Sequence, residues 1–382
     1  MADSLARALE LSARYDGEVR RLLPPGADIF DVHTHLGNDI DGMVGDYDEL
    51  EKTMGDWGFS RAFVFCLDEP DRHPAFTAAN DRTLAFAARS NGRLLPFVRL
   101  DLNESPVEEA KRCLDAGARG IKLHPRAQRF DAGDDRLAPV FALAEEYRVP
   151  ILIHGGRGLP PIASGLARLV EQSPDAALII AHAGIADLAH LAETMAGRRN
   201  VFFDTSTWGA VDLLDLYRRI APEQIVYASD FPYGQQPNSL FIALRTAHRA
   251  GLSEQQLRDM LAGNANRLAD GEELPEPTQP VGGGTIEQSL QLARIHAYIA
   301  MAMPFLWLRQ PDTMGGLGLA INAAAERDGH IETTDRIGEL LEVAAALWSS
   351  VPDREDEAER LAAIRATQRL IHIADIETLT SG

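Results

Sequence analysis

The feature that most constrains the fold of this sequence is a regular alternation of short apolar runs with longer Ala-, Leu- and Glu-rich segments. The alternation begins near Asp28 and stops near Asn266. Strands that alternate with helices in this way predict βαβ units and a parallel sheet. Eight such units over roughly 250 residues match the size of a (β/α)8, or TIM, barrel. The eight runs are DIFDVHTH, RAFVFCLD, LLPFVRLD, ARGIKLHP, VPILIHGG, AALIIAHAG, NVFFDTST and QIVYASDFP.

Composition shifts divide the chain into three parts. Residues 1–270 are expected to form the barrel domain, which begins with an amphipathic N-terminal helix. Residues 271–285 are rich in Pro, Gly and acidic side chains, which is typical of a linker. Residues 286–382 have a helical pattern throughout. The predicted fold class is therefore α/β: a TIM barrel with an N-terminal helix and a C-terminal helical appendage.

Charge and cysteine content narrow the expected partners and compartment. The net charge of -20 argues against nucleic acid or an anionic membrane as a partner. Two cysteines do not make a disulfide framework, and the N-terminus lacks the apolar core of a secretion signal, so we expect a cytoplasmic protein. The apolar run from Tyr298 to Leu308 is too short to span a bilayer. It packs either within the chain or on another subunit, which leaves a homo-oligomer through the C-terminal helices open.

Polar residues fall at the ends of the predicted strands, where TIM barrels carry their catalytic groups. The first run ends in His33 and His35, which are two residues apart and so point to the same side of a strand. The fifth, sixth and eighth runs end in His154, His182 and Asp230. Imidazole and carboxylate together suit Zn²⁺, Fe²⁺ or Mn²⁺. The spacing therefore predicts a metal site at one end of the barrel.

The ordered segments DVHTH, GIKLHP, PILIHGG, IIAHAG, FFDTS and YASDFPYG resemble the amidohydrolase superfamily. They are most similar to its amidohydrolase 2 branch, which includes aminocarboxymuconate-semialdehyde decarboxylase. The resemblance implies that His33, His35, His154 and Asp230 bind one divalent ion, with Zn²⁺ expected first and Mn²⁺ or Fe²⁺ as alternatives. It also implies a small-molecule substrate and catalytic roles for Asp230, which would deprotonate a water, and for His182, which would orient that water or stabilise developing charge.

Other strand-end residues leave alternatives open. Lys122, on the fourth strand, either contacts substrate and carboxylates or, when carboxylated, bridges a second metal ion; we favour a single ion. His124 either contacts substrate or makes a strand-end hydrogen bond. Asp204 either orients a ligand histidine or caps the next helix. Asp31 is expected to make a structural hydrogen bond.

The reaction expected first is hydrolysis of an amide, ester or lactone bond in a small molecule. The alternative is non-oxidative decarboxylation of an unsaturated or aromatic carboxylic acid, because related barrels carry out both reactions with one ligand set. An arginine that holds a carboxylate beside the metal would favour decarboxylation, and Arg126 and Arg157 follow the fourth and fifth strands. A third reading is a barrel that binds metal or ligand without turnover and acts as an assembly module.

Overall fold

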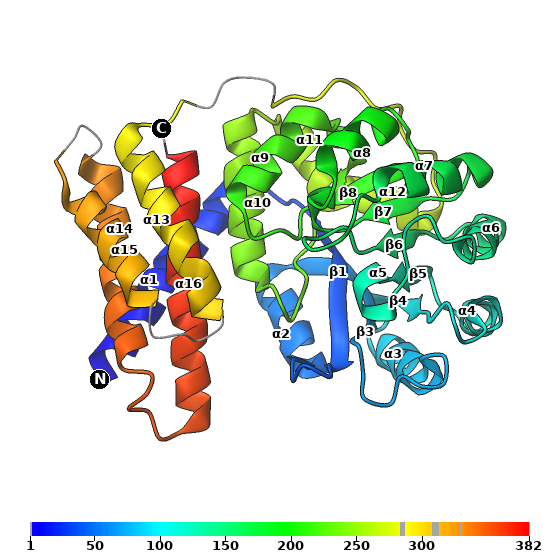
Figure 1. The fold of residues 1–382 in the computed structure, drawn as a ribbon, viewed down its shortest axis with the longest axis horizontal. Coiled ribbons are helices and arrows are strands. Elements are labelled where there is room, and N and C mark those ends of the chain that lie inside the picture. The colour runs from blue at the N-terminus through cyan, green and yellow to red at the C-terminus, as the bar shows by residue number, and fades with distance from the viewer. Residues whose placement is uncertain (1, 283–286, 308–312, 328–330, 382) are drawn as a thin grey trace.

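A nine-stranded sheet forms the centre of the molecule (Figure 1). The computed structural model describes residues 2–282, 287–307, 313–327 and 331–381. Eight strands are parallel and coincide with the eight predicted runs, and the short β2 pairs antiparallel with the end of β1. The strands are β1 Ile29–Asn38, β2 Val44–Gly45, β3 Phe59–Cys66, β4 Leu94–Arg99, β5 Gly120–Leu123, β6 Ile151–Ile153, β7 Leu178–Ile180, β8 Val201–Asp204 and β9 Ile225–Val226.

Hydrogen bonds between β1 and the segment after β9 close the sheet into a barrel. The backbone N–H of Val32 donates to the carbonyl of Tyr227 over 3.1 Å, and that of Asp230 donates to the carbonyl of His33 over 2.9 Å. Thr34 forms a parallel bridge with Phe231. The first and last predicted strands are therefore neighbours, which brings the two ends of the alternating region together.

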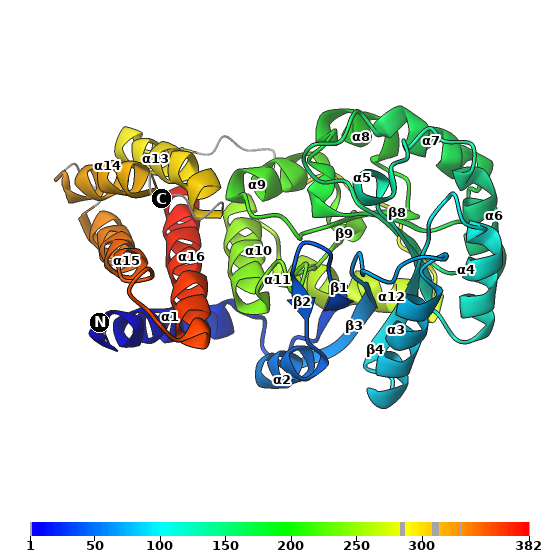
Figure 2. The ribbon, with the colours of Figure 1, turned by 60° about the horizontal axis from the view of Figure 1, so that its bottom comes forward.

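Helices follow the strands and surround the barrel (Figures 1 and 2). Their ends carry the expected signals; for example, the Asp46 side chain caps α2, and Gly58 ends it in a left-handed conformation. The helices of the barrel are α2 Tyr47–Trp57, α3 Thr77–Arg89, α4 Pro106–Asp115, α5 Pro125–Gln128, α6 Leu137–Tyr147, α7 Ala163–Gln172, α8 Leu188–Met195, α9 Ala210–Arg219, α10 Gln236–Ala250, α11 Glu254–Arg258 and α12 Asn264–Asp270.

An apolar layer fills the barrel interior below the polar strand ends. Buried side chains that include Phe97, Leu152 and Phe202 belong to this layer. Side chains two residues further along a strand point to the same face. Strand pleating therefore places His154 and Asp204 one level above Leu152 and Phe202, and the same rule places the buried Arg99 above Phe97.

The C-terminal helices form a bundle beside the barrel, and the N-terminal helix lies among them (Figures 1 and 2). This helix, α1, packs against α15, α16 and α10, and α16 also contacts α9 and α10. Glu377 of α16 is fully buried and pairs with Arg336 of α15 at 2.7 Å and Arg245 of α10 at 3.4 Å. The bundle helices are α1 Ala2–Leu22, α13 Leu290–Trp307, α14 Thr313–Ala325, α15 Ile331–Ser349 and α16 Glu357–Thr380.

The predicted linker leaves the barrel after α12. Residues 272–280 form neither helix nor strand, and 283–285 lie outside the described residues. The division at 270 and 285 stays a prediction, with the added finding that α1 packs against the C-terminal helices. In the part of the chain that the structure describes, no helix is both long and apolar enough to cross a bilayer.

Candidate metal centre

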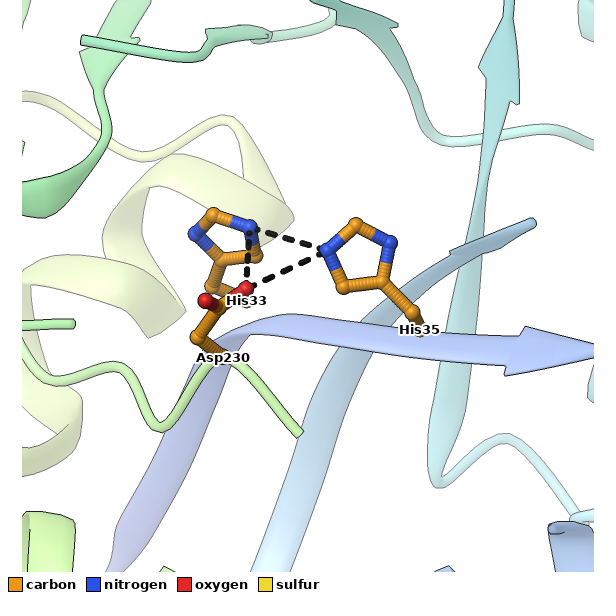
Figure 3. Close-up of side chains that lie close together, drawn as sticks. All are labelled: His33, His35 and Asp230. Carbon is orange, nitrogen blue, oxygen red and sulfur yellow. Dashed lines mark hydrogen bonds and ion pairs between the residues drawn. The ribbon is translucent and has the colours of Figure 1, made fainter. Parts of the chain in front are cut away.

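Three predicted ligands converge at the carboxyl end of the barrel (Figure 3). The Nε2 atoms of His33 and His35, both on β1, lie 3.2 Å apart. Asp230, which follows β9, places Oδ1 3.2 Å from His33 Nε2 and 3.3 Å from His35 Nε2. Two imidazole nitrogens and a carboxylate oxygen facing one point are a donor set for a divalent transition metal.

Asp204 at the end of β8 sets the tautomer of His33. Its Oδ2 accepts a hydrogen bond from His33 Nδ1 over 2.8 Å, so the lone pair of the ring lies on Nε2, which faces the other ligands. Asp204 Oδ1 accepts from the backbone N–H of His182 at 2.7 Å and from Ser206 Oγ at 2.6 Å. Of the two readings of Asp204, the contacts therefore match orientation of a ligand histidine.

A second chain of hydrogen bonds orients His182 and His154. His182 Nδ1 lies 2.8 Å from the carbonyl oxygen of Ser206, which can only accept, so this nitrogen donates. The lone pair on His182 Nε2 then accepts from His154 Nδ1 at 2.9 Å. His154 is left with its lone pair on Nε2, the form that a metal ligand needs. His154 lies outside the three-residue cluster, so its role as the fourth ligand stays a prediction.

Burial controls the protonation of the site. Desolvation lowers the pKa values of the His33, His35 and His154 imidazoles well below the usual value, so these rings are neutral. Burial also raises the pKa of the Asp230 carboxyl, which makes it a stronger base than an exposed aspartate. Neutral imidazoles, with the tautomers of His33 and His154 set by their hydrogen bonds, fit a divalent metal, because protonated rings cannot bind one.

The backbone at two of these residues is strained. His182 has φ 56° and Asp230 has φ 61°, which is the left-handed region that non-glycine residues rarely adopt. Such conformations cost about 1–3 kcal/mol and persist where surrounding contacts impose them. The hydrogen bond from Asp230 N–H to the His33 carbonyl and the bond from His182 N–H to Asp204 are such contacts. Both strained residues present their side chains to the site.

A family model described as an amidohydrolase matches residues 30–269, which is more than half of the chain. The chain belongs to the amidohydrolase 2 family. No curated protein matches it. Among solved structures it is similar to a putative amidohydrolase from Staphylococcus aureus, at 16% identity and a TM-score of 0.51, covering 64% of this chain and 99% of that one. It is also similar to 2,6-dihydroxybenzoate decarboxylase from Rhizobium, at 18% identity and a TM-score of 0.50, covering 64% and 98%. At these identities the two structures support the barrel fold alone.

The cluster of candidate ligands, His33, His35 and Asp230, opens into a cavity of about 520 Å³, which we call the head cavity. Five further predicted site residues line it: Lys122, His124, Arg126, His154 and His182. His124 stacks on His154 with ring centroids 4.0 Å apart, and its Nδ1 accepts from the backbone N–H of Ala127. The expected strand-end hydrogen bond is therefore present, and contact with substrate stays a prediction. Arg157 is not among the lining residues. It is 76% exposed and pairs with Asp212 at 2.8 Å.

Two cations lie deep in the head cavity. Lys122 is 1% exposed, and its Nζ is 3.1 Å from His33 Nε2. Burial lowers the pKa of this ammonium, and nearby Asp230 opposes that effect. Arg99 is 2% exposed, donates to the carbonyl of Cys66 and lies 4.0 Å from Asp68. Its Nε is buried and has no hydrogen-bond partner among the described residues, and the residue lines the head cavity.

Sequence reasoning missed Arg99, although the signal was present. The run LLPFVRLD has Arg99 at its end, in the same position relative to its strand as the histidines of other runs. Tyr233, in the quoted segment YASDFPYG, was also not singled out, and it lines the head cavity with its ring 5.9 Å from that of His35. Asp31, in contrast, was predicted correctly: it accepts hydrogen bonds from Ser229 and Gln236.

Proposed function

We propose that this amidohydrolase hydrolyses an amide, ester or lactone bond in a small molecule, using one divalent metal ion. His33, His35 and Asp230 would hold the ion together with His154. The observation that carries the proposal is the convergence of two imidazole nitrogens and one carboxylate oxygen within 3.3 Å of one another at the base of the head cavity. Zn²⁺ suits this donor set best, and Mn²⁺ or Fe²⁺ are the alternatives.

A bound divalent ion polarises a carbonyl group and lowers the pKa of a water that it holds. Asp230, whose pKa burial raises, accepts a proton from the attacking water as the new carbon–oxygen bond forms. The same carboxyl then returns the proton to the leaving nitrogen or oxygen as its bond to carbon breaks. His182 holds His154 through the 2.9 Å hydrogen bond, and so keeps the wall of the site in place.

Decarboxylation is the second candidate, and Arg99 is the observation that favours it. A buried guanidinium with an unpartnered Nε, beside the Lys122 ammonium, suits a substrate carboxylate at the base of the head cavity. In that reaction the bond between the carboxylate and its carbon breaks, carbon dioxide leaves, and the carbon takes up a proton. Asp230 in its protonated form would supply that proton.

Proton balance separates the two reactions at neutral pH. Hydrolysis of an ester or lactone releases a proton, whereas decarboxylation consumes one and forms carbon dioxide. The zinc-loaded enzyme would be incubated in a pH-stat with phenyl acetate, dihydrocoumarin, an N-acyl amide and 2,6-dihydroxybenzoate. We expect acid release with phenyl acetate or dihydrocoumarin, or release of a free amine from the N-acyl amide, which leaves the pH unchanged. Asp230→Asn should lose this activity. Asp215→Asn, in an exposed pair with Arg219 on α9, is the matched control.

Three results would contradict parts of this proposal. Carbon dioxide release with proton uptake would replace hydrolysis by decarboxylation. Full activity of Asp230→Asn would remove the catalytic role of that residue. Metal-loaded protein that turns over none of a broad set of esters, lactones, amides and acids would favour the assembly module over an enzyme.

A further inference from the structure

A second cavity, of about 670 Å³, lies between the barrel and the C-terminal helices. We call it the body cavity. His154, His182 and Asp230 line both this cavity and the head cavity, so the two spaces meet at the candidate metal centre. The remaining wall comes from the loops after β6, β7 and β8, from the start of α9, and from α13 and α16. The helical appendage therefore forms part of the wall beside the metal centre.

The body cavity differs in chemistry from the head cavity. Its polar side chains are largely paired with one another: Arg157 with Asp212 at 2.8 Å, and His296 with Asp375 at 2.7 Å. Between them lie apolar side chains, so a ligand in this space gains free energy mainly by burying apolar surface. The apolar lining residues are Ile185, Trp208, Val211, Ala300, Met303 and Pro304.

Helix α16 is tied to the loop that orients the metal centre. His372, which is 3% exposed, has Nε2 2.9 Å from the carbonyl oxygen of Trp208, and their rings lie 5.2 Å apart. Ser206, two residues before Trp208, accepts the hydrogen bond of His182 and donates to Asp204. The appendage therefore contacts the loop whose Ser206 sets the tautomer of His182. The position of α16 helps to determine the shape of the body cavity, which lies between this loop and the C-terminal helices.

We propose that the two cavities are two arms of one substrate site, and that the substrate is a small carboxylic acid with an apolar body. The carboxylate lies against Arg99 and Lys122 in the head cavity, and the apolar body lies against α13 in the body cavity. This rests on the proposed function, because the scissile bond must then lie where the arms meet, beside Asp230. Met303 and Ala300 on α13 are the specificity-determining residues of the appendage.

Binding of three carboxylic acids to the purified full-length protein tests the two-arm site without requiring turnover. The probes are benzoate, 2-naphthoate and 4-phenylbutyrate, titrated calorimetrically. Burial of the additional apolar surface predicts that the two larger acids bind about tenfold tighter than benzoate. Met303→Trp and Ala300→Trp fill the body cavity and should reduce this advantage to about threefold or less, with benzoate affinity unchanged. Met301→Trp is the control, because Met301 is on the same helix, is 58% exposed and is not among the lining residues.

The outcomes separate the two proposals. Equal affinity for all three acids, or an advantage that survives both filling variants, overturns the two-arm site and leaves the proposed hydrolysis standing. Arg99→Gln should weaken the binding of all three acids by a similar factor. If none of the acids binds, the carboxylate arm and this inference both fail, while the pH-stat assay still decides the proposed function. Thermal unfolding monitored by circular dichroism establishes that each variant is folded.

Discussion

His33 donates from Nδ1 to Asp204 Oδ2 over 2.8 Å, although 171 positions separate the two residues in the sequence. Both side chains are almost fully buried, with exposed fractions of 1% and 0%. Because Asp204 Oδ1 is already occupied by the His182 backbone and by Ser206, Oδ2 is left for the imidazole. The direction of this one hydrogen bond determines whether His33 offers a lone pair to a metal.

Asp204→Asn should therefore weaken metal binding. The backbone N–H groups of His182 and Ser206 and the Ser206 hydroxyl all donate to Oδ1, so an oxygen is retained there. The amide NH₂ group then faces His33 Nδ1 and forces the proton onto Nε2. We expect metal affinity, measured by competition with a chromophoric chelator, to fall by about 10- to 100-fold. Asp215→Asn on α9 serves as the control. An unchanged affinity would show that Asp204 does not set the tautomer.

Metal content tests the number of ions. Mass spectrometry of protein purified without added metal or chelator should find about one equivalent of zinc, iron or manganese. His33→Ala/His35→Ala should contain none, because it loses two of the three clustered ligand atoms. A His248→Ala variant, altered on the exposed end of α10, controls for the loss of a histidine. Two equivalents would instead support the bridging carbamate on Lys122.

Gly156→Ala should disturb His154. A Cβ atom at position 156 would lie 2.8 Å from His154 Nε2, which is closer than real Cβ atoms approach, and 3.1 Å from His182 Cδ2, which is a tight contact. Displacement of the imidazole by a few tenths of an ångström or more should reduce turnover, by up to about 100-fold. Gly133→Ala, where a Cβ would meet nothing within 4 Å, should be neutral. Reduced turnover with unchanged metal affinity would mean that His154 is not a ligand.

The His296–Asp375 pair should make the stability of the appendage depend on pH. Asp375 accepts from His296 Nδ1 at 2.7 Å, and this hydrogen bond raises the pKa of the imidazole above 6.5. A raised pKa in the folded state means that the pair stabilises the protein fully below pH 6.5, and that this contribution is lost as pH rises through the folded pKa.

The measurement is the thermal midpoint of wild type and His296→Asn between about pH 5.5 and pH 9. The wild-type advantage should be largest at the acidic end and disappear at the alkaline end. His248→Asn is the matched control, because the His248 ring lies 3.3 Å from the neutral Leu22 carbonyl oxygen rather than beside a carboxylate. A difference between wild type and His296→Asn that is constant with pH would contradict the role of the charged pair.

The sequence alone determined the barrel fold and which polar side chains lie at the carboxyl ends of its strands. Strands of a parallel sheet are buried on both faces, so each appears in the sequence as a short apolar run. All eight of the predicted runs form parallel strands. The pleat then places every second residue on one face, so His33 and His35 on β1 and the residues that end β5 and β6 had to meet at one end of a closed barrel. The hydrogen bonds of Asp31 were predicted correctly, whereas for Asp204 the sequence left two readings open and the contacts of the folded chain distinguish them.

Only the tertiary structure decided which ion pairs and packing contacts these side chains make. Arg99 is a candidate for binding a substrate carboxylate because the fold places it above Phe97, in the wall of the head cavity. Arg157 instead pairs with Asp212 and does not line that cavity. The packing of α1 on α15 and α16, and the body cavity lined by Met303 and its neighbours, depend on contacts between segments hundreds of positions apart. Helical periodicity reports that a helix has an apolar face but not what covers that face, because many surfaces satisfy the same burial of apolar area.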